Sequence, residues 1–167
     1  KIDKWNRILA ISEKIGKKAG LKENDLQILR LACFFMDIGL IGVPDSILDS
    51  DKKLSEEEYE KIKRHPHLAK SLLKGFPHFE DVLDIISTHH ENWDGSGYPE
   101  GLSGGEIPVE SRILHIADVF VSMQTHRKFR RGMDRISVLE HIEKMKDKIF
   151  DPDLVEILKE LSDSGLV

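Results

Sequence analysis

Apolar and polar residues follow a helical period along most of this chain. In the first segment, Ile8, Ile11, Ile15 and Ala19 fall on one face of a helix, and Gly20 follows as the kind of residue that commonly ends one. Asn24 or Asp25 can cap a second helix. Its inward-facing residues are expected to be Ile28, Leu31, Ala32 and Phe35.

Helix-breaking and helix-starting residues divide the rest of the chain. Gly39, Gly42 and Pro44 end the second helix, and Ser55 with Glu58 three residues later is typical of a capping box. Further helices are expected at residues 45–48, 55–64, 66–75, 79–88, 111–125, 134–148 and 152–161. The pattern therefore predicts an all-α fold, a compact helical bundle in a single domain covering residues 1–167.

A long irregular stretch over residues 92–109 interrupts the helices. It holds five of the twelve glycines, together with Pro99 and Pro108. A loop of this length in a compact domain is usually functional or disordered. Trp93 and Tyr98 favour an ordered loop, because aromatic side chains give it something to pack.

Composition narrows the class of protein. The chain has 167 residues, of which 40% are hydrophobic and 33% charged, and it contains no apolar run of the roughly 20 residues that a membrane span needs. We therefore expect a cytoplasmic domain without membrane contact, and Cys33 as a buried thiol. The net charge of −5 argues against a nucleic-acid polymer as partner. Because Lys1 opens directly into a helical pattern, the chain is expected to be a fragment of a longer protein.

Five residues suggest metal chemistry: Asp37, His65, His89, His90 and Asp118. The two aspartates lie among apolar residues, where an ionised carboxylate must be paired, protonated or coordinated. Each could be a capping or ion-paired residue. The adjacent histidines can reach one site only if their helix ends there. Imidazole with carboxylate suits Fe, Mn or Zn, and such a metal can activate water and clamp a phosphodiester.

A basic cluster follows Asp118 and is formed by Arg127, Lys128, Arg130 and Arg131. It is interpreted either as a solvated helix end or as a contact for substrate phosphates.

Several motifs together resemble the HD-GYP family, an all-α subgroup of the HD phosphohydrolases. They are DIG at 37–39, IGVPDSIL at 41–48, KRHP at 63–66, HHENWDGSGYP at 89–99, EIP at 106–108, RIL at 112–114 and ADVF at 117–120. The resemblance covers nearly the whole chain. It implies hydrolysis of cyclic di-GMP with the help of two or three metals, commonly iron or manganese.

The resemblance also implies a role for each candidate residue. Asp37 is expected to bridge metals, Asp118 to close the ligand set, and these two carboxylates to form the catalytic centre. The histidines at 65, 89 and 90 are the other ligands. Substrate contacts are expected from Arg127, Arg130, Gly97, Tyr98 and Pro99. The loop at 95–99, which holds these last three residues, is also expected to contact a diguanylate cyclase or an adaptor protein, and Asp94 to hold it in place.

Departures from the family pattern gather around one metal position. Met36 stands where the family has histidine and is expected to be a core residue, while Leu40 replaces a lysine. Lys4 replaces an upstream histidine, and its ammonium is a candidate substitute for the missing charge. We therefore expect one firmly bound divalent metal, Fe or Mn, with a second weak or absent.

Three functions follow as alternatives. The first is a cyclic di-GMP phosphodiesterase of reduced activity, and the second is an inactive effector that binds cyclic di-GMP. The third is a module that docks a signalling partner through the loop at 95–99. An upstream sensory or receiver domain is expected from the resemblance alone.

Overall fold

The computed structural model describes residues 2–50, 52–126 and 131–167, with only the backbone at position 2. Helices account for all the regular elements in these ranges. In chain order they are α1 (Ile2–Lys18), α2 (Glu23–Phe35), η1 (Ile38–Gly42), α3 (Asp45–Leu48), α4 (Glu56–Lys63), α5 (His65–Leu73), η2 (Pro77–Phe79), α6 (Glu80–Thr88), η3 (Gly104–Glu106), α7 (Val109–Gln124), α8 (Arg135–Lys144) and α9 (Pro152–Asp163), where η marks a 3₁₀ turn.

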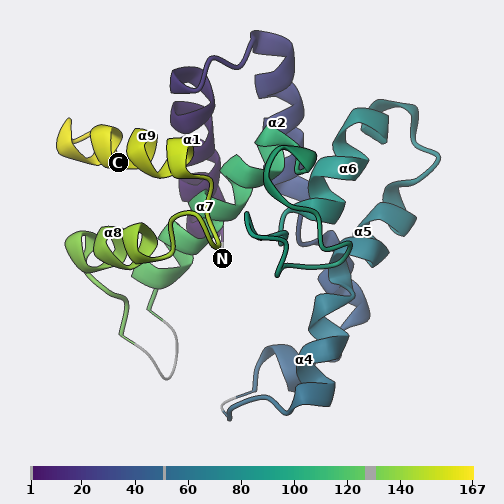
Figure 1. Cartoon of the computed structure of the whole chain (residues 1–167). Coiled ribbons are helices and arrows are strands. Elements are labelled where there is room, and N and C mark those ends of the chain that lie inside the picture. Colours follow the sequence, from purple (N-terminus) through teal and green to yellow (C-terminus); the bar gives the residue numbers. More distant parts are fainter. Residues whose placement is uncertain (1, 51, 127–130) are drawn as a thin grey trace.

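Helix α7 runs through the middle of the bundle (Figure 1). It packs against α1 and α2, with α8 and α9 on one side and α6 on the other. Helix α5 packs on α6 and on η1. The fully buried side chains include Ile8, Ile15, Leu29, Leu114 and Phe120, which together fill the space between α1, α2 and α7. Burial of this apolar surface is the main force that holds the helices together.

Most helix boundaries agree with the sequence-based predictions. Helix α4 begins with the expected capping box, because Ser55 Oγ accepts from Glu58 N at 3.2 Å and Glu58 Oε2 accepts from Ser55 N at 2.8 Å. Gly20 follows α1 with φ +87°, a conformation that favours glycine. Cys33 is buried, as predicted, and burial raises the pKa of its thiol to about 12.

The prediction for α2 was wrong in detail. The helix begins at Glu23 and not after Asn24 or Asp25; instead, the Asp25 carboxylate accepts a hydrogen bond from the backbone N–H of Lys22. Its buried face consists of Leu26, Leu29, Ala32 and Cys33, whereas Leu31 is 37% exposed. The helix sits between α1 and α6, and these neighbours select the buried face. Ala19 is likewise exposed, and α8 ends earlier than predicted.

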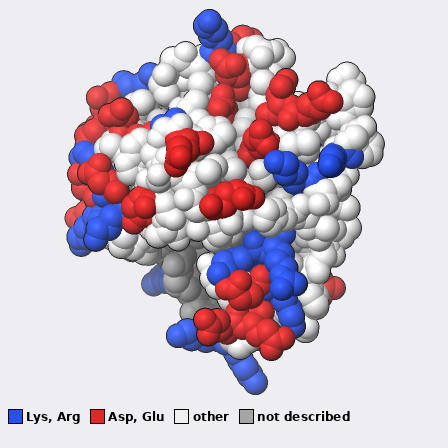
Figure 2. All heavy atoms as spheres, turned by 45° about the vertical axis from the view of Figure 1, so that its right-hand side comes forward, with Lys and Arg blue, Asp and Glu red and all other residues white. Residues whose placement is uncertain are grey.

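Charged side chains of both signs are spread over the surface shown in Figure 2. They are densest on the lower projection, where α4 carries three glutamates in its first turn and two lysines in its last. None of the helices in the described part of the chain combines the length and hydropathy that a membrane crossing requires.

Candidate metal centre

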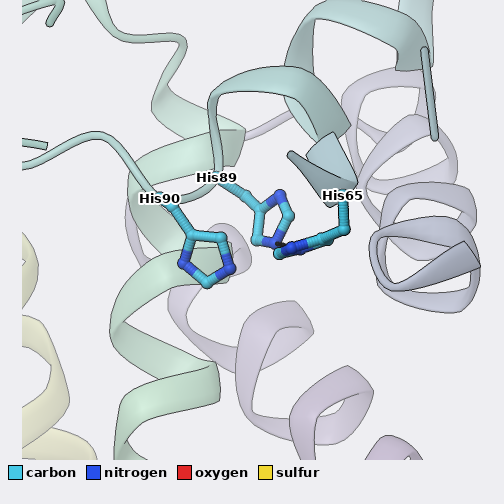
Figure 3. A group of neighbouring side chains, drawn as sticks. All are labelled: His65, His89 and His90. Atoms are coloured by element: carbon cyan, nitrogen blue, oxygen red, sulfur yellow. Dashed lines mark hydrogen bonds between the residues drawn. The ribbon is translucent and has the colours of Figure 1, made fainter. Parts of the chain in front are cut away.

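Three histidines converge at the junction of α5, α6 and the following loop. His65 is the first residue of α5, His89 caps the C-terminal end of α6, and His90 follows it. One ring nitrogen of each lies within 4.8 Å of the others, and Figure 3 shows the rings turned toward one another. The helix does end at the histidine pair, as predicted, which allows both rings to face one site.

Backbone carbonyls determine the tautomers of two of these rings. His65 Nδ1 lies 2.8 Å from Ile62 O, and His89 Nδ1 lies 2.7 Å from Ile86 O. A carbonyl oxygen only accepts, so each neutral ring carries its proton on Nδ1 and a lone pair on Nε2. The two Nε2 atoms then face each other at 3.4 Å with no proton between them. A cation is the partner that such a pair of lone pairs fits, and a carbonyl behind each imidazole is a common support for a metal ligand.

Burial keeps the imidazoles of His89 and His90 neutral and therefore able to bind a cation. Burial, and after it the neighbouring His65, lower the pKa of His89 to about 3. Burial, followed by His89, also lowers the pKa of His90 well below its ordinary value. The charged form of a buried imidazole is disfavoured because it loses its hydration. The donor set accordingly fits a divalent metal of the kind that binds imidazole, such as Fe, Mn or Zn.

We expect the metal-free protein to lose stability as the pH falls below about 6.5. Below that value the unfolded chain takes up protons on His89 and His90, whereas the folded chain resists them, so the free energy of unfolding rises with pH. The slope should be roughly 1 kcal/mol per pH unit for each histidine. Denaturant unfolding of chelated protein between about pH 5 and 7.5 measures it. The exposed His78 provides a control: His78→Gln should leave the slope unchanged, and an absent slope in the parent chain would contradict the prediction.

The two aspartates lie near His65 and His89. Asp37 precedes η1, and its Oδ1 is 3.8 Å from His65 Nε2. Burial, together with the nearby Asp118 carboxylate, raises the pKa of Asp37. Burial alone would also raise the pKa of Asp118, but the Lys4 ammonium at 2.8 Å outweighs it and the net shift is downward. Ser122 Oγ donates to the same Asp118 oxygen at 3.1 Å.

Two of the departures from the family pattern have clear positions. Met36 is 1% exposed and belongs to the hydrophobic core, as predicted. Leu40 lines a cavity of about 630 Å³ that Lys4, Trp5 and Asp37 also border. This side of the site therefore holds two carboxylates and one ammonium, and Met36 adds no strong metal ligand to it.

The loop after His90 closes the opposite side. The ring of Tyr98 stacks on that of His90 with centroids 4.9 Å apart, and Tyr98 N donates to His90 O. Gly97 passes so close to the preceding backbone that a Cβ there would lie 2.2 Å from Asn92 N. Asp94 holds the turn, as predicted, by accepting from Ser96 N at 2.9 Å and from Ser96 Oγ at 2.6 Å.

Two residues that support the site were missed from the sequence. Glu91 is 2% exposed, and its Oε1 accepts from Glu100 N and Gly101 N, which fastens the loop to the histidine pair. His115, which the sequence analysis does not single out, is also buried, with Nδ1 2.9 Å from Glu91 O. Its apolar neighbours on the central helix were the available signal.

Of the predicted substrate contacts, the three loop residues lie in the described part of the chain and the two arginines do not. Tyr98 and Gly97 border a cavity of about 370 Å³ that His90 also lines. Pro99 follows Tyr98 through a cis peptide bond. Arg127 and Arg130, the predicted phosphate contacts, lie outside the described residues.

The sequence profile of the HD domain family matches residues 1–154. The chain belongs to the HD domain family. This confirms the family expected from the motifs, and the helical architecture confirms the expected fold. A solved HD-GYP-type protein from Bdellovibrio bacteriovorus has the same fold, with a TM-score of 0.78 and 18% identity over 96% of this chain and 51% of that one.

Two curated relatives are more similar in sequence. The cyclic di-GMP phosphodiesterase response regulator RpfG of Xanthomonas campestris is 36% identical over 91% of this chain and 41% of its own length. A 3′3′-cGAMP-specific phosphodiesterase of Vibrio cholerae is 33% identical over 92% of this chain and 30% of its own length. This chain thus spans less than half the length of each relative.

Proposed function

We propose that this chain is a metal-dependent phosphodiesterase domain that hydrolyses a cyclic dinucleotide, with cyclic di-GMP as its substrate. The observation that carries the proposal is a set of three imidazoles, of which His65 and His89 are buried and His90 is half-buried. The Nε2 lone pairs of His65 and His89 face each other beside Asp37. This arrangement suits a cation and occurs in a domain whose relatives include a cyclic di-GMP phosphodiesterase.

The chain's own residues hold and orient the reacting groups in this proposal. His65, His89, His90 and Asp37 would hold the metal, which we expect to be Fe or Mn. When bound, that cation supplies Lewis-acid stabilisation of the phosphodiester and lowers the pKa of water. The carbonyls of Ile62 and Ile86 keep the rings of His65 and His89 in the ligating tautomer.

Asp118 adds a second negative charge to the site beside that of Asp37. Tyr98 stacks on His90, which positions the imidazole ring, and it lines the neighbouring cavity. Gly97 lets the loop pass close enough to place that ring. The cavities next to Asp37 and His90, about 630 and 370 Å³, are in the range that small-molecule sites occupy. Further phosphate contacts are proposed from Arg127 and Arg130, and Pro99 is proposed as a substrate contact at the loop.

Anaerobic incubation of the metal-loaded chain with cyclic di-GMP, followed by chromatography of the nucleotides, tests the proposal. We expect linear dinucleotide or GMP in the presence of Fe(II) or Mn(II), and no product after chelation. Parallel incubation with 3′3′-cGAMP tests the choice of substrate, because one relative is specific for that molecule. A folded, metal-loaded chain that hydrolyses neither nucleotide would refute the enzymatic function.

A second candidate is an effector that binds cyclic di-GMP without cutting it. The burial of Met36 and the ion pair between Lys4 and Asp118 favour it, because both reduce the ligands left for a second metal. Calorimetry that detects binding of cyclic di-GMP, combined with no turnover, would favour this role. In either case we propose the loop at 95–99 as a contact for a diguanylate cyclase or an adaptor, within a longer cytoplasmic protein with an upstream sensory or receiver domain.

A further inference from the structure

Lys4 reaches the candidate metal centre from α1. Its Nζ lies 2.8 Å from Asp118 Oδ1, and the two side chains are 27% and 18% exposed. A second polar contact joins the same two helices three residues later on α1 and six residues later on α7, where Arg7 Nη2 donates to Gln124 Oε1 at 2.7 Å. This second contact between α1 and α7 fixes the register that places the ammonium opposite the carboxylate.

The charges around Lys4 differ from those around the histidines. On the histidine side, three imidazole rings and Asp37 lie close enough together to offer their ligand atoms to one cation. On the Lys4 side, the Asp37 carboxylate borders the same cavity as Lys4, and the Lys4 ammonium lies 2.8 Å from Asp118 Oδ1, where its positive charge offsets those of the two carboxylates. A divalent ion there would have to displace or face the ammonium, and like charges at contact distance repel strongly in a part-buried site.

We propose that the Lys4 ammonium replaces a second metal ion in this centre, so that the site consists of one metal held by the histidines and one fixed organic cation. The catalytic role of Lys4 in this inference rests on the proposed function. A substrate phosphate in the 630 Å³ cavity, which both Lys4 and Asp37 border, would meet one metal and one ammonium. The charge of the second cation is then built into the chain and does not depend on metal supply.

Metal content tests the proposal directly. After equilibration with excess Mn(II) and removal of unbound ion, the parent chain should retain one manganese per chain, measured by elemental analysis. The paired change of Lys4→His with Met36→His, which supplies two imidazoles in place of the ammonium and the thioether, should raise the content toward two. Two ions retained by the parent chain would overturn the proposal.

Thermal melting of the chelated protein supplies an independent readout. Lys4→Gln removes the charge that offsets the carboxylates, and we expect the melting temperature to fall by about 5 °C or more. Lys4→Arg keeps the charge and should recover most of that loss. Lys18→Gln is the matched control on the same helix, because Lys18 pairs with Glu160 at 2.7 Å on the exposed surface and should shift the melting temperature by about 1 °C at most.

Added Mn(II) separates loss of charge from general damage. Millimolar Mn(II) should raise the melting temperature of the Lys4→Gln chain by more than it raises that of the parent, since the ion can then enter the vacated position. If the Lys4→Gln chain does not fold without metal, Mn(II) should restore folding. Equal melting of parent and Lys4→Gln chains, or a lack of rescue, would refute the inference. None of these measurements uses a nucleotide. A chain that fails to hydrolyse cyclic di-GMP could therefore still confirm the role of Lys4, and the two proposals can fail independently.

Discussion

Replacing His89 by glutamine should abolish metal binding at physiological concentrations and, with it, any phosphodiesterase activity. The ring is 1% exposed and offers its Nε2 to the centre, 3.4 Å from Nε2 of His65. A glutamine amide is a much weaker ligand for Fe or Mn and has no carbonyl-supported tautomer. We expect the affinity for Mn(II) to fall by roughly 100-fold or more, measured by calorimetry or by competition with a chelator.

The matched control for this experiment is His78→Gln. His78 lies in η2 and is exposed to solvent, so it should not be a metal ligand. Its substitution should leave both the affinity for Mn(II) and the melting temperature of the metal-loaded chain unchanged. If the His89→Gln chain retained the affinity of the parent, the three histidines would not be the metal centre, and the proposed chemistry would have to be located elsewhere.

Replacing Gly39 by alanine should destabilise the protein by about 3 kcal/mol and disorganise the site. An alanine Cβ at this position would lie 1.9 Å from His65 O and 2.8 Å from Ala69 N. These are backbone atoms of α5, so they cannot move aside as a flexible side chain would, and η1 and α5 would have to separate. Asp37 immediately precedes η1 and His65 begins α5, so the two candidate ligands would move apart. Denaturant unfolding and Mn(II) titration measure the two effects.

Gly105→Ala is the control for the chemical change from glycine to alanine. A Cβ at Gly105 meets nothing within 4 Å, and the substitution should change the free energy of unfolding by less than about 0.5 kcal/mol. A Gly39→Ala chain that unfolds and binds metal like the Gly105→Ala chain would show that the contact between η1 and α5 can relax. The close approach would then not be what positions Asp37 against His65.

Local signals in the sequence were sufficient for most helices and for the histidines. Neighbouring residues alone predict three features: the capping box at Ser55, the end of the first helix at Gly20 and the irregular stretch after His90. The structure confirms each of them. Two adjacent histidines can face one site only if their helix ends at them, and α6 does end there.

Features that depend on distant partners were not predictable in the same way. The buried face of α2 includes Leu29 and excludes Leu31, because α1 and α6 pack against it from directions that the local period does not reveal. The ion pair of Lys4 with Asp118 joins α1 to α7. Its partner could not be named from spacing, even though the charge of Lys4 was noted. The burial of His115 and Glu91 likewise follows from the loop folding back on α7.

The histidine pair sits at the C-terminal end of α6, and this position has an electrostatic consequence. Aligned peptide dipoles place a partial negative charge, roughly half an elementary charge, at that end of a helix. The potential at His89 and His90 therefore attracts cations and repels anions before any ligand bond forms. A phosphodiester approaching the metal-free site would meet the negative end of α6 and the Asp37 carboxylate, and the Lys4 ammonium, which would offset them, is already paired with Asp118. We expect binding to be ordered, with the cation first and the phosphate second, and a metal-free chain to have little affinity for the nucleotide.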